Sequence, residues 1–223
     1  MKRTELVLPI STAVMVIISL FAIFVIAPKE RVMGLVQKIF YYHVSAGWIG
    51  LFAFFILFIA SILYLATRDE KWDIICHSTG RIGVLFTSIV LMTGPIWAKA
   101  VWNTWWTWDP RLTSTLLLWF LYVGYLKLRK FIGDNQNKMS YAAIFGIIAF
   151  IDVPIVFFSI RWWQSIHPVL FTGTGFNMSR AMLPAFFTSL LAFTLLFLFM
   201  LDYDMKLERL RRDVEGLKKD LLF

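Results

Sequence analysis

The chain has 223 residues, of which 59% are hydrophobic and only 16% are charged, and its mean hydropathy is +0.72. A soluble domain is usually about half apolar and a quarter charged, so this composition excludes an ordinary soluble protein. The net charge of +8 does not indicate a nucleic-acid partner, because long apolar blocks leave no soluble basic surface. The apolar residues form unbroken blocks without alternation, which predicts an all-α integral membrane protein and excludes a membrane β-barrel.

Six blocks are long enough, or nearly long enough, to cross a bilayer, because a transmembrane helix needs about 17–25 residues. In chain order they are residues 6–27, 39–66, 79–97, 112–128, 141–160 and 181–201. The fourth is the shortest. The first follows the basic sequence MKR as a signal peptide would, but it has no small-x-small cleavage site, so we expect a retained helix. Residues 1–201 are therefore predicted to form one six-helix membrane domain.

Six spans would place both termini on the same side of the membrane. Most of the 22 Lys and Arg residues fall in the termini and in the connecting segments of that side. The positive-inside rule therefore places both termini in the cytoplasm. Segments 28–38, 97–111 and 161–180 are then expected on the outer side of the membrane.

The outer sequence WNTWWTWDPRLTS, residues 102–114, has four tryptophans in seven positions. Trp and Tyr are enriched at both membrane interfaces, so an anchoring belt is one explanation. Only Trp72 of the ten tryptophans belongs to the inner side, and this asymmetry is greater than anchoring requires. A one-sided aromatic platform that stacks on a large planar ligand is the favoured explanation. Its candidate members are Trp102, Trp105, Trp106, Trp108, Trp162 and Trp163.

Two of the three histidines lie on the same predicted side as this platform. His43 stands in FYYHVSAGW at the outer mouth of the second block, and His167 stands in RWWQSIHP just beyond the fifth. A single histidine is more often structural than a ligand, and we expect that of His77 at the inner end of the third block. Two imidazoles beside an indole platform, however, favour axial ligation of a haem iron from both faces.

Haem carries two propionates, which outer cations could pair with. Arg111 follows the sequence WDP directly and offers the planar guanidinium that suits carboxylates. Lys99, Arg161 and Arg180 are alternatives, although Lys99 and Arg161 could simply snorkel at helix ends. Asp109 precedes Pro110 at the start of the fourth block, so we expect Asp109 to be structural and to orient Arg111 or a histidine N–H.

These motifs also carry a family resemblance, over about residues 6–201. WNTWWTWDPRLTS resembles the WWD signature of the haem-handling proteins of cytochrome c maturation, and this WWD loop occupies about residues 97–114. With YYHVSAG before it and WWQSIHP after it, the chain is similar to CcmC-type members. The resemblance implies axial ligation by His43 and His167. It also implies a porphyrin held by Trp102, Trp105, Trp106, Trp108 and Asp109. Asn103 departs from the pattern, because glycine, which permits close backbone approach, is usual there.

The resemblance further implies a function and partners. CcmC-like proteins lie in the bacterial cytoplasmic (inner) membrane and bind haem at its outer, periplasmic face, as haem b in transit. They pass it to a CcmE-like haem chaperone for c-type cytochrome biogenesis. They work with a CcmD-like small membrane protein and a CcmAB-like ABC transporter. The chain has no Walker-type loop or catalytic triad, so we expect a delivery protein and not an enzyme. We therefore expect the protein to contact these partner proteins and membrane lipid.

Two other functions remain open. A cytochrome b-like electron-transfer subunit commonly has a second haem, and on the inner side this chain offers only His77 as a ligand. A haem translocator would need a path of polar side chains through the bilayer. His77 and Asp152 are the candidates for such a path, and two residues are little support for it. Asp152 lies within the fifth block two residues before Pro154. An intramembrane carboxylate is costly, and a packing role is favoured over haem or proton chemistry.

The tail 202–223 is predicted to be a cytoplasmic helix. Residues 202–220 hold six acids and six bases, and apolar residues recur at intervals of three and four, which gives a short heptad seam. The members of this seam are Leu207, Leu210, Val214, Leu217 and Leu221. The helix could be solvated, lie on the membrane surface or dock on a partner helix.

Overall fold

The computed structural model describes residues 3–31, 33–132, 137–173 and 175–222. Its α-helices are α1 (Arg3–Phe21), α2 (Gln37–Thr67), α3 (Glu70–Trp102), α4 (Pro110–Phe131), α5 (Lys138–Ala149), α6 (Asp152–Trp162) and α7 (Leu183–Leu222). The π-helical turn η1 (Ala22–Ile26) continues α1, and the 3-10 turn η2 (Arg180–Met182) precedes α7. Strands β1 (Phe171–Thr172) and β2 (Gly175–Phe176) form a two-residue antiparallel ladder. The predicted all-α class is confirmed.

Five helical stretches are long and apolar enough to cross a membrane. They are Leu6–Ile26, Gln37–Thr67, Glu70–Trp102, Lys138–Trp162 and Arg180–Lys218. These stretches correspond to the first, second, third, fifth and sixth predicted blocks, which is consistent with the predicted integral membrane protein. The fourth block forms α4, a helix of 22 residues with Arg129 and Lys130 in its last turn. Because α4 is not among the five, the count of six spans stays a prediction.

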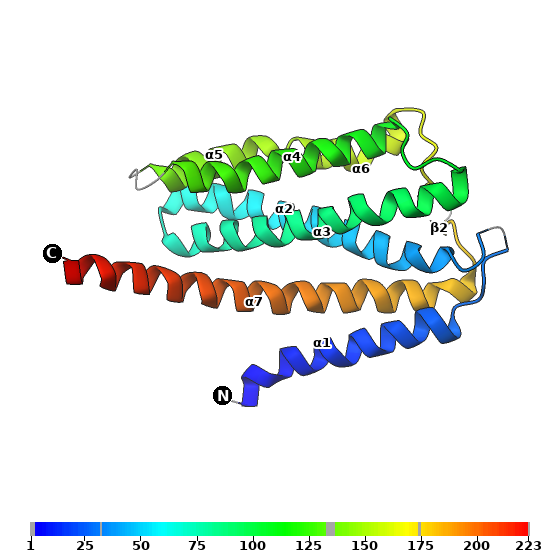
Figure 1. The fold of residues 1–223 in the computed structure, drawn as a ribbon, viewed down its shortest axis with the longest axis horizontal. Helices are drawn as coiled ribbons and strands as arrows, with labels where there is room; N and C mark the ends of the chain where they lie inside the picture. Colours follow the sequence, from blue (N-terminus) through cyan, green and yellow to red (C-terminus); the bar gives the residue numbers. More distant parts are fainter. Residues whose placement is uncertain (1–2, 32, 133–136, 174, 223) are drawn as a thin grey trace.

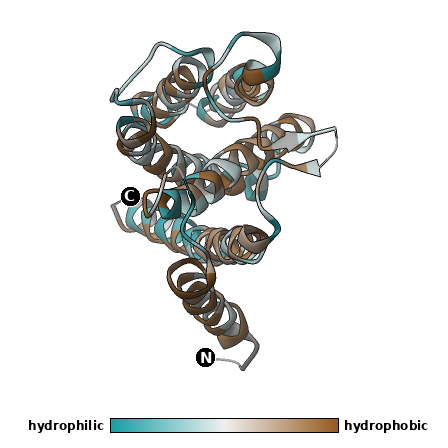
Figure 2. Cartoon of the chain, turned by 90° about the vertical axis from the view of Figure 1, so that its right-hand side faces the viewer, coloured by the Kyte–Doolittle hydropathy of each residue, from teal (hydrophilic) through white to brown (hydrophobic). Residues whose placement is uncertain are grey.

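The long helices run side by side along one axis, and both termini lie at the same end of the bundle (Figure 1). In that view α4, α5 and α6 form one layer, α2 and α3 lie beneath them, and α7 and then α1 follow. The Ser45 hydroxyl of α2 donates to Ser189 Oγ of α7 at 2.9 Å, and Ser189 donates to the Tyr41 carbonyl at 3.1 Å. Figure 2 shows α1 as almost uniformly apolar, which suits a helix with lipid around much of its surface.

Glycines of α3 allow this helix to pack closely on its neighbours. A Cβ atom on Gly83 would lie 2.3 Å from Phe54 Cε1 of α2, so no other residue fits without displacing that ring. The Phe54 ring also stacks on Tyr122 of α4, with centroids 3.5 Å apart and an interplanar angle of 7°. Small residues permit such close approach between membrane helices. The contact fixes α2, α3 and α4 relative to one another.

An ionic cluster ties three helices together at the end of the bundle that carries the termini. Arg129 of α4 donates to both carboxylate oxygens of Asp73 of α3, at 2.6 and 2.8 Å. Arg212 of α7 donates to Asp73 Oδ2 at 2.6 Å. Nearby, His77 Nδ1 lies 3.1 Å from Glu208 Oε1. His77 therefore contacts a structural ion-pair network at the end of the bundle away from the other two histidines.

The fifth predicted block is divided into α5 and α6 by a turn at residues 150–151. Pro154 cannot donate to the Phe150 carbonyl, and the Val153 N–H donates to that oxygen instead at 3.0 Å. Asp152, the first residue of α6, is buried, and its Oδ2 has no hydrogen-bond partner among the residues that the structure describes. Its expected packing role stays a prediction.

Candidate functional site

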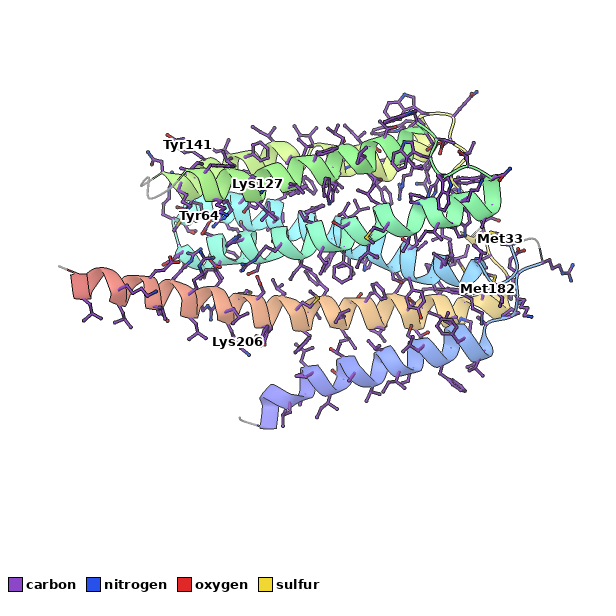
Figure 3. The ribbon with its side chains drawn as sticks, viewed as in Figure 1. Met33, Tyr64, Lys127, Tyr141, Met182 and Lys206 are labelled. Atoms are coloured by element: carbon purple, nitrogen blue, oxygen red, sulfur yellow. The ribbon has the colours of Figure 1, made fainter. Side chains whose placement is uncertain are left out.

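A cavity of about 680 Å³ lies toward the end of the bundle opposite the termini, between α2 and α3 on one side and α4 and α6 on the other. Met33 and Met182 line it, and Figure 3 places both methionines at that end, whereas Tyr64 and Tyr141 lie at the other. Pockets for small molecules and cofactors usually measure about 300–1,000 Å³. The cavity is therefore large enough for a substantial ligand.

Two histidine rings lie close together at the wall of this cavity. His43 is in the second turn of α2, and His167 is in the irregular segment between α6 and β1. Their ring centroids are 6.4 Å apart, and their planes are inclined by 31°. Two metal–imidazole bonds of about 2 Å each, together with half the width of each ring, span roughly 6 Å. One metal atom would therefore fit between the two rings.

Thr93 of α3 orients the His43 ring and determines which nitrogen is free. His43 Nδ1 lies 2.9 Å from Thr93 Oγ1, and Thr93 Oγ1 lies 2.7 Å from the Ile89 carbonyl. A hydroxyl has one proton, which Thr93 donates to that carbonyl, so Thr93 must accept the Nδ1–H of His43. This tautomer leaves the lone pair on Nε2, the atom available to a metal. No pattern in the sequence singled out Thr93, because a threonine inside an apolar helix is common.

His167 is held mainly through its backbone. Its N–H donates to Ser165 Oγ at 3.1 Å, while its ring Nδ1 has no partner in hydrogen-bonding geometry among the described residues. Burial lowers the pKa of His167 to about 4, and the positive charge of Arg111 contributes to this shift. His167 is therefore neutral at pH 7, which is the form that ligates a metal.

Asp109 connects the tryptophan loop to the turn that carries His167. Its Oδ1 accepts the Arg111 N–H at 2.9 Å, so Asp109 is the N-cap of α4. The same carboxylate accepts the Ser165 hydroxyl at 3.0 Å and the Ile166 N–H at 2.9 Å. Asp109 thus contacts the two residues before His167 and the backbone of Arg111, and not the imidazole itself.

The six predicted platform tryptophans divide into two groups. Trp102 and Trp106 line the cavity, and the Trp102 ring centroid lies 6.4 Å from that of His167 in an edge-on arrangement. The other four are more than half exposed and do not line it; they are Trp105, Trp108, Trp162 and Trp163. The structure therefore brings two of the six tryptophans to the cavity wall.

Trp97 is a lining residue that was not among the predicted site residues. Its indole N–H and that of Trp106 are buried without a hydrogen-bond partner among the described residues. Buried donors normally have a partner, so two unsatisfied donors at a cavity wall suit a ligand with acceptor oxygens. The position of Trp97 near the end of α3, beside the WWD loop, is the sequence signal that could have identified it.

Arg111 places a cation at the same cavity. One of its Nη atoms donates to the Val156 carbonyl at 2.5 Å and to the Phe157 carbonyl at 3.3 Å. A guanidinium has five N–H donors, so these contacts orient Arg111 while other donors are left for a ligand. Arg161 also lines the cavity, and Lys99 does not. The cavity thus combines apolar walls, two imidazoles and cationic donors that suit carboxylates.

Asn103 has the backbone conformation that explains why glycine is usual at this position. It is the C-cap of α3 and has a left-handed conformation with φ of 55°. Glycine adopts this region freely, and asparagine tolerates it better than most residues. Lys99 Nζ donates to the Asn103 carbonyl at 3.2 Å and to its side-chain Oδ1 at 2.9 Å. The departure from the pattern is therefore compatible with the local backbone.

Replacing Asn103 with valine is expected to destabilise the protein by about 1–2 kcal/mol, because a β-branched residue is strained in the left-handed region. The Asn103→Gly variant should be at least as stable as the original chain. Thermal unfolding in detergent, followed by circular dichroism, would measure both variants. Equal stability of the valine and glycine variants would contradict the assigned backbone strain.

Comparisons with known proteins give a consistent result. The family model described as Heme exporter protein C matches residues 1–220. Heme exporter protein C of Bradyrhizobium diazoefficiens is 33% identical over 220 residues, which cover 96% of this chain and 83% of that protein. A putative cytochrome c biosynthesis ccmC-like mitochondrial protein of Marchantia polymorpha is 38% identical over 142 residues, which cover 64% of this chain and 60% of that protein. Heme exporter protein C of Escherichia coli is 34% identical over 141 residues, covering 63% and 58% respectively.

Proposed function

The chain belongs to the Heme exporter protein C family, and from this we propose that it holds haem between His43 and His167 and delivers it for c-type cytochrome biogenesis. Its family supports a role in haem delivery for cytochrome c maturation. The observation that carries the haem site is the close pair of imidazoles, with centroids 6.4 Å apart, at the wall of a large apolar cavity. Two such rings provide the axial ligands of a six-coordinate haem iron.

The other lining residues have separate roles in this proposal. Trp102 and Trp106 contact the porphyrin, since indole rings contribute large apolar area at low entropic cost. Arg111 and the unsatisfied indole N–H of Trp97 bind the propionates. Asp109 acts through the turn that carries His167. Haem b is bound as transient cargo without covalent attachment, because the sequence has no Cys-x-x-Cys-His motif.

The exposed tryptophans extend the site beyond the cavity. Trp105, Trp108, Trp162 and Trp163 lie on segments adjoining it and are available to a partner or to the membrane interface. A CcmE-like haem chaperone is the proposed acceptor on the periplasmic side. A CcmD-like small protein and a CcmAB-like ABC transporter are the proposed membrane partners. The protein acts in this assembly as a carrier without catalytic activity of its own.

The proposed topology has six spans, with α4 as the fourth and both termini in the cytoplasm. A helix of 22 residues is about 33 Å long at a rise of 1.5 Å per residue, which matches a hydrocarbon core of about 30 Å. α4 lies alongside α3 and α6, and Arg129 at its far end is buried against Asp73. The excess of Lys and Arg in the termini and in the connecting segments on their side supports cytoplasmic termini.

The visible absorption spectrum of the purified protein tests the haem site. The original chain and a matched control, His77→Ala, are expected to show a low-spin bis-histidine haem. His43→Ala and His167→Ala are each expected to lose haem or to convert it to high spin. Absence of haem from the original chain, or an unchanged spectrum in both ligand variants, would contradict the proposal.

A further inference from the structure

We propose that the two axial ligands are not equivalent, so that His43 keeps hold of the iron and His167 is the ligand that leaves when haem is passed on. This inference rests on the proposed haem site and assigns different roles to its two ends. It follows from the way each imidazole is supported by the rest of the protein.

His43 is constrained by three elements of the fold. Its backbone is inside α2, which is anchored to α7 through the contact between Ser189 and the Tyr41 carbonyl. Its Nδ1–H is bound to Thr93, whose own proton is bound to a helix carbonyl. A Cβ atom on Gly94 would lie only 3.3 Å from His43 Cε1, so the ring also packs directly against the α3 backbone. Withdrawal of this ring would break a hydrogen bond and disturb two helices.

His167 has much weaker support for its ring. The segment from residue 163 to residue 170 has no regular secondary structure. The Asp109 carboxylate holds the segment through Ser165 and Ile166, while Nδ1 of the ring lacks a partner in hydrogen-bonding geometry among the described residues. Rotation of this ring away from the iron therefore breaks no hydrogen bond at Nδ1 and needs no movement of a helix. The backbone of Pro168, which does interact with the ring, belongs to the same irregular segment.

The chemical step is a ligand exchange. The bond between iron and His167 Nε2 breaks, and a bond forms between iron and a lone-pair nitrogen or oxygen of the acceptor protein. The oxidation state of iron is unchanged, and His167 returns to a neutral imidazole. The Trp102 ring adjoins His167, and the exposed Trp162 and Trp163 directly precede the His167 segment. The side of the iron on which His167 is exchanged therefore lies beside exposed tryptophans that a partner could contact.

Imidazole rescue of cavity variants tests this asymmetry. His43→Gly and His167→Gly would be purified from cells making haem, and free imidazole would then be added to each. His167→Gly is expected to keep its haem through purification and to regain a low-spin spectrum with imidazole. His43→Gly is expected to lose its haem during purification. The reverse pattern, or equal retention by both variants, would overturn the asymmetry.

Thr93 is a positioning residue in this scheme, and it provides a second readout. Thr93→Val keeps the shape but removes the hydroxyl, which is expected to weaken haem binding by about tenfold and to shift the reduction potential. Thr93→Ser should restore both quantities. Haem affinity and potential that are unchanged in Thr93→Val would overturn the role of Thr93 in fixing His43.

The two experiments separate this inference from the proposed function. If the original chain binds haem and both glycine variants lose it to the same extent, the asymmetry is wrong while the haem site stands. If neither glycine variant changes the spectrum, His43 and His167 are not the ligands, and both proposals are wrong.

Discussion

Replacing Asp109 with alanine is expected to weaken haem binding by about 10–100-fold, because residues that orient metal ligands usually have effects of this size. The substitution removes both acceptors that hold the Ser165–Ile166 turn, so His167 loses its fixed position opposite His43. It also removes the N-cap of α4, which costs about 0.5–2 kcal/mol of stability. Haem titration into the apoprotein in detergent, followed by absorbance, would measure the affinity.

The chain offers a matched control for the lost cap. Asp69 is the N-cap of α3 and accepts the Lys71 N–H at 2.9 Å, at the end of the bundle away from the cavity. Asp69→Ala removes the same kind of helix cap and should leave haem affinity unchanged. If Asp109→Ala bound haem as tightly as Asp69→Ala, the carboxylate would not position His167.

Replacing Asp73 with asparagine is expected to lower the free energy of unfolding by about 3–5 kcal/mol, because it leaves the Arg129 charge buried without its partner. The Asp73 and Arg129 side chains are only 2% and 7% exposed. Arg212 of α7 also loses one of its carboxylate contacts. Chemical denaturation in detergent, or the midpoint of thermal unfolding, would measure the change.

An exposed ion pair provides the control for this second prediction. Asp202 and Lys206 lie one turn apart on α7, with side chains 51% and 57% exposed, and such pairs contribute at most about 1 kcal/mol. Asp202→Asn should therefore change stability little. The double variant Asp73→Leu with Arg129→Met should recover much of the loss, because it removes both buried charges. If Asp73→Asn were as stable as Asp202→Asn, the buried cluster would not stabilise the bundle.

The helices of this fold could largely be predicted from the sequence, because hydropathy reports which segments avoid water. Hydropathy identified the five apolar stretches that the structure shows as long helical segments. It did not predict that the fifth divides into α5 and α6 just before Pro154. Hydropathy does not report which helix faces meet, so the Asp73–Arg129 pair was not predicted. The two residues are far apart in the chain, and only tertiary packing brings them together.

The candidate site was predictable in its chemistry and less so in its geometry. His43 and His167 were singled out by residue type and by their shared predicted side of the membrane, and the structure places their ring centroids 6.4 Å apart. The tryptophans of residues 105–108 lie outside regular helices, so no periodicity indicated which indoles face the cavity. Thr93 was missed because its importance comes from its contact with His43 and not from its residue type.

The length of α7 has a mechanical consequence. Its 40 residues form one unbroken helix, which at 1.5 Å per residue is about 60 Å long, or twice the thickness of the hydrocarbon core. One rigid rod therefore reaches from Ser189, which touches the turn of α2 just before His43, to Arg212 in the ionic cluster. A force applied to the charged part of α7, from Asp202 onward, would therefore tilt the whole helix. The α2 turn that carries His43 and the ionic cluster at the far end of the bundle are thus coupled through α7.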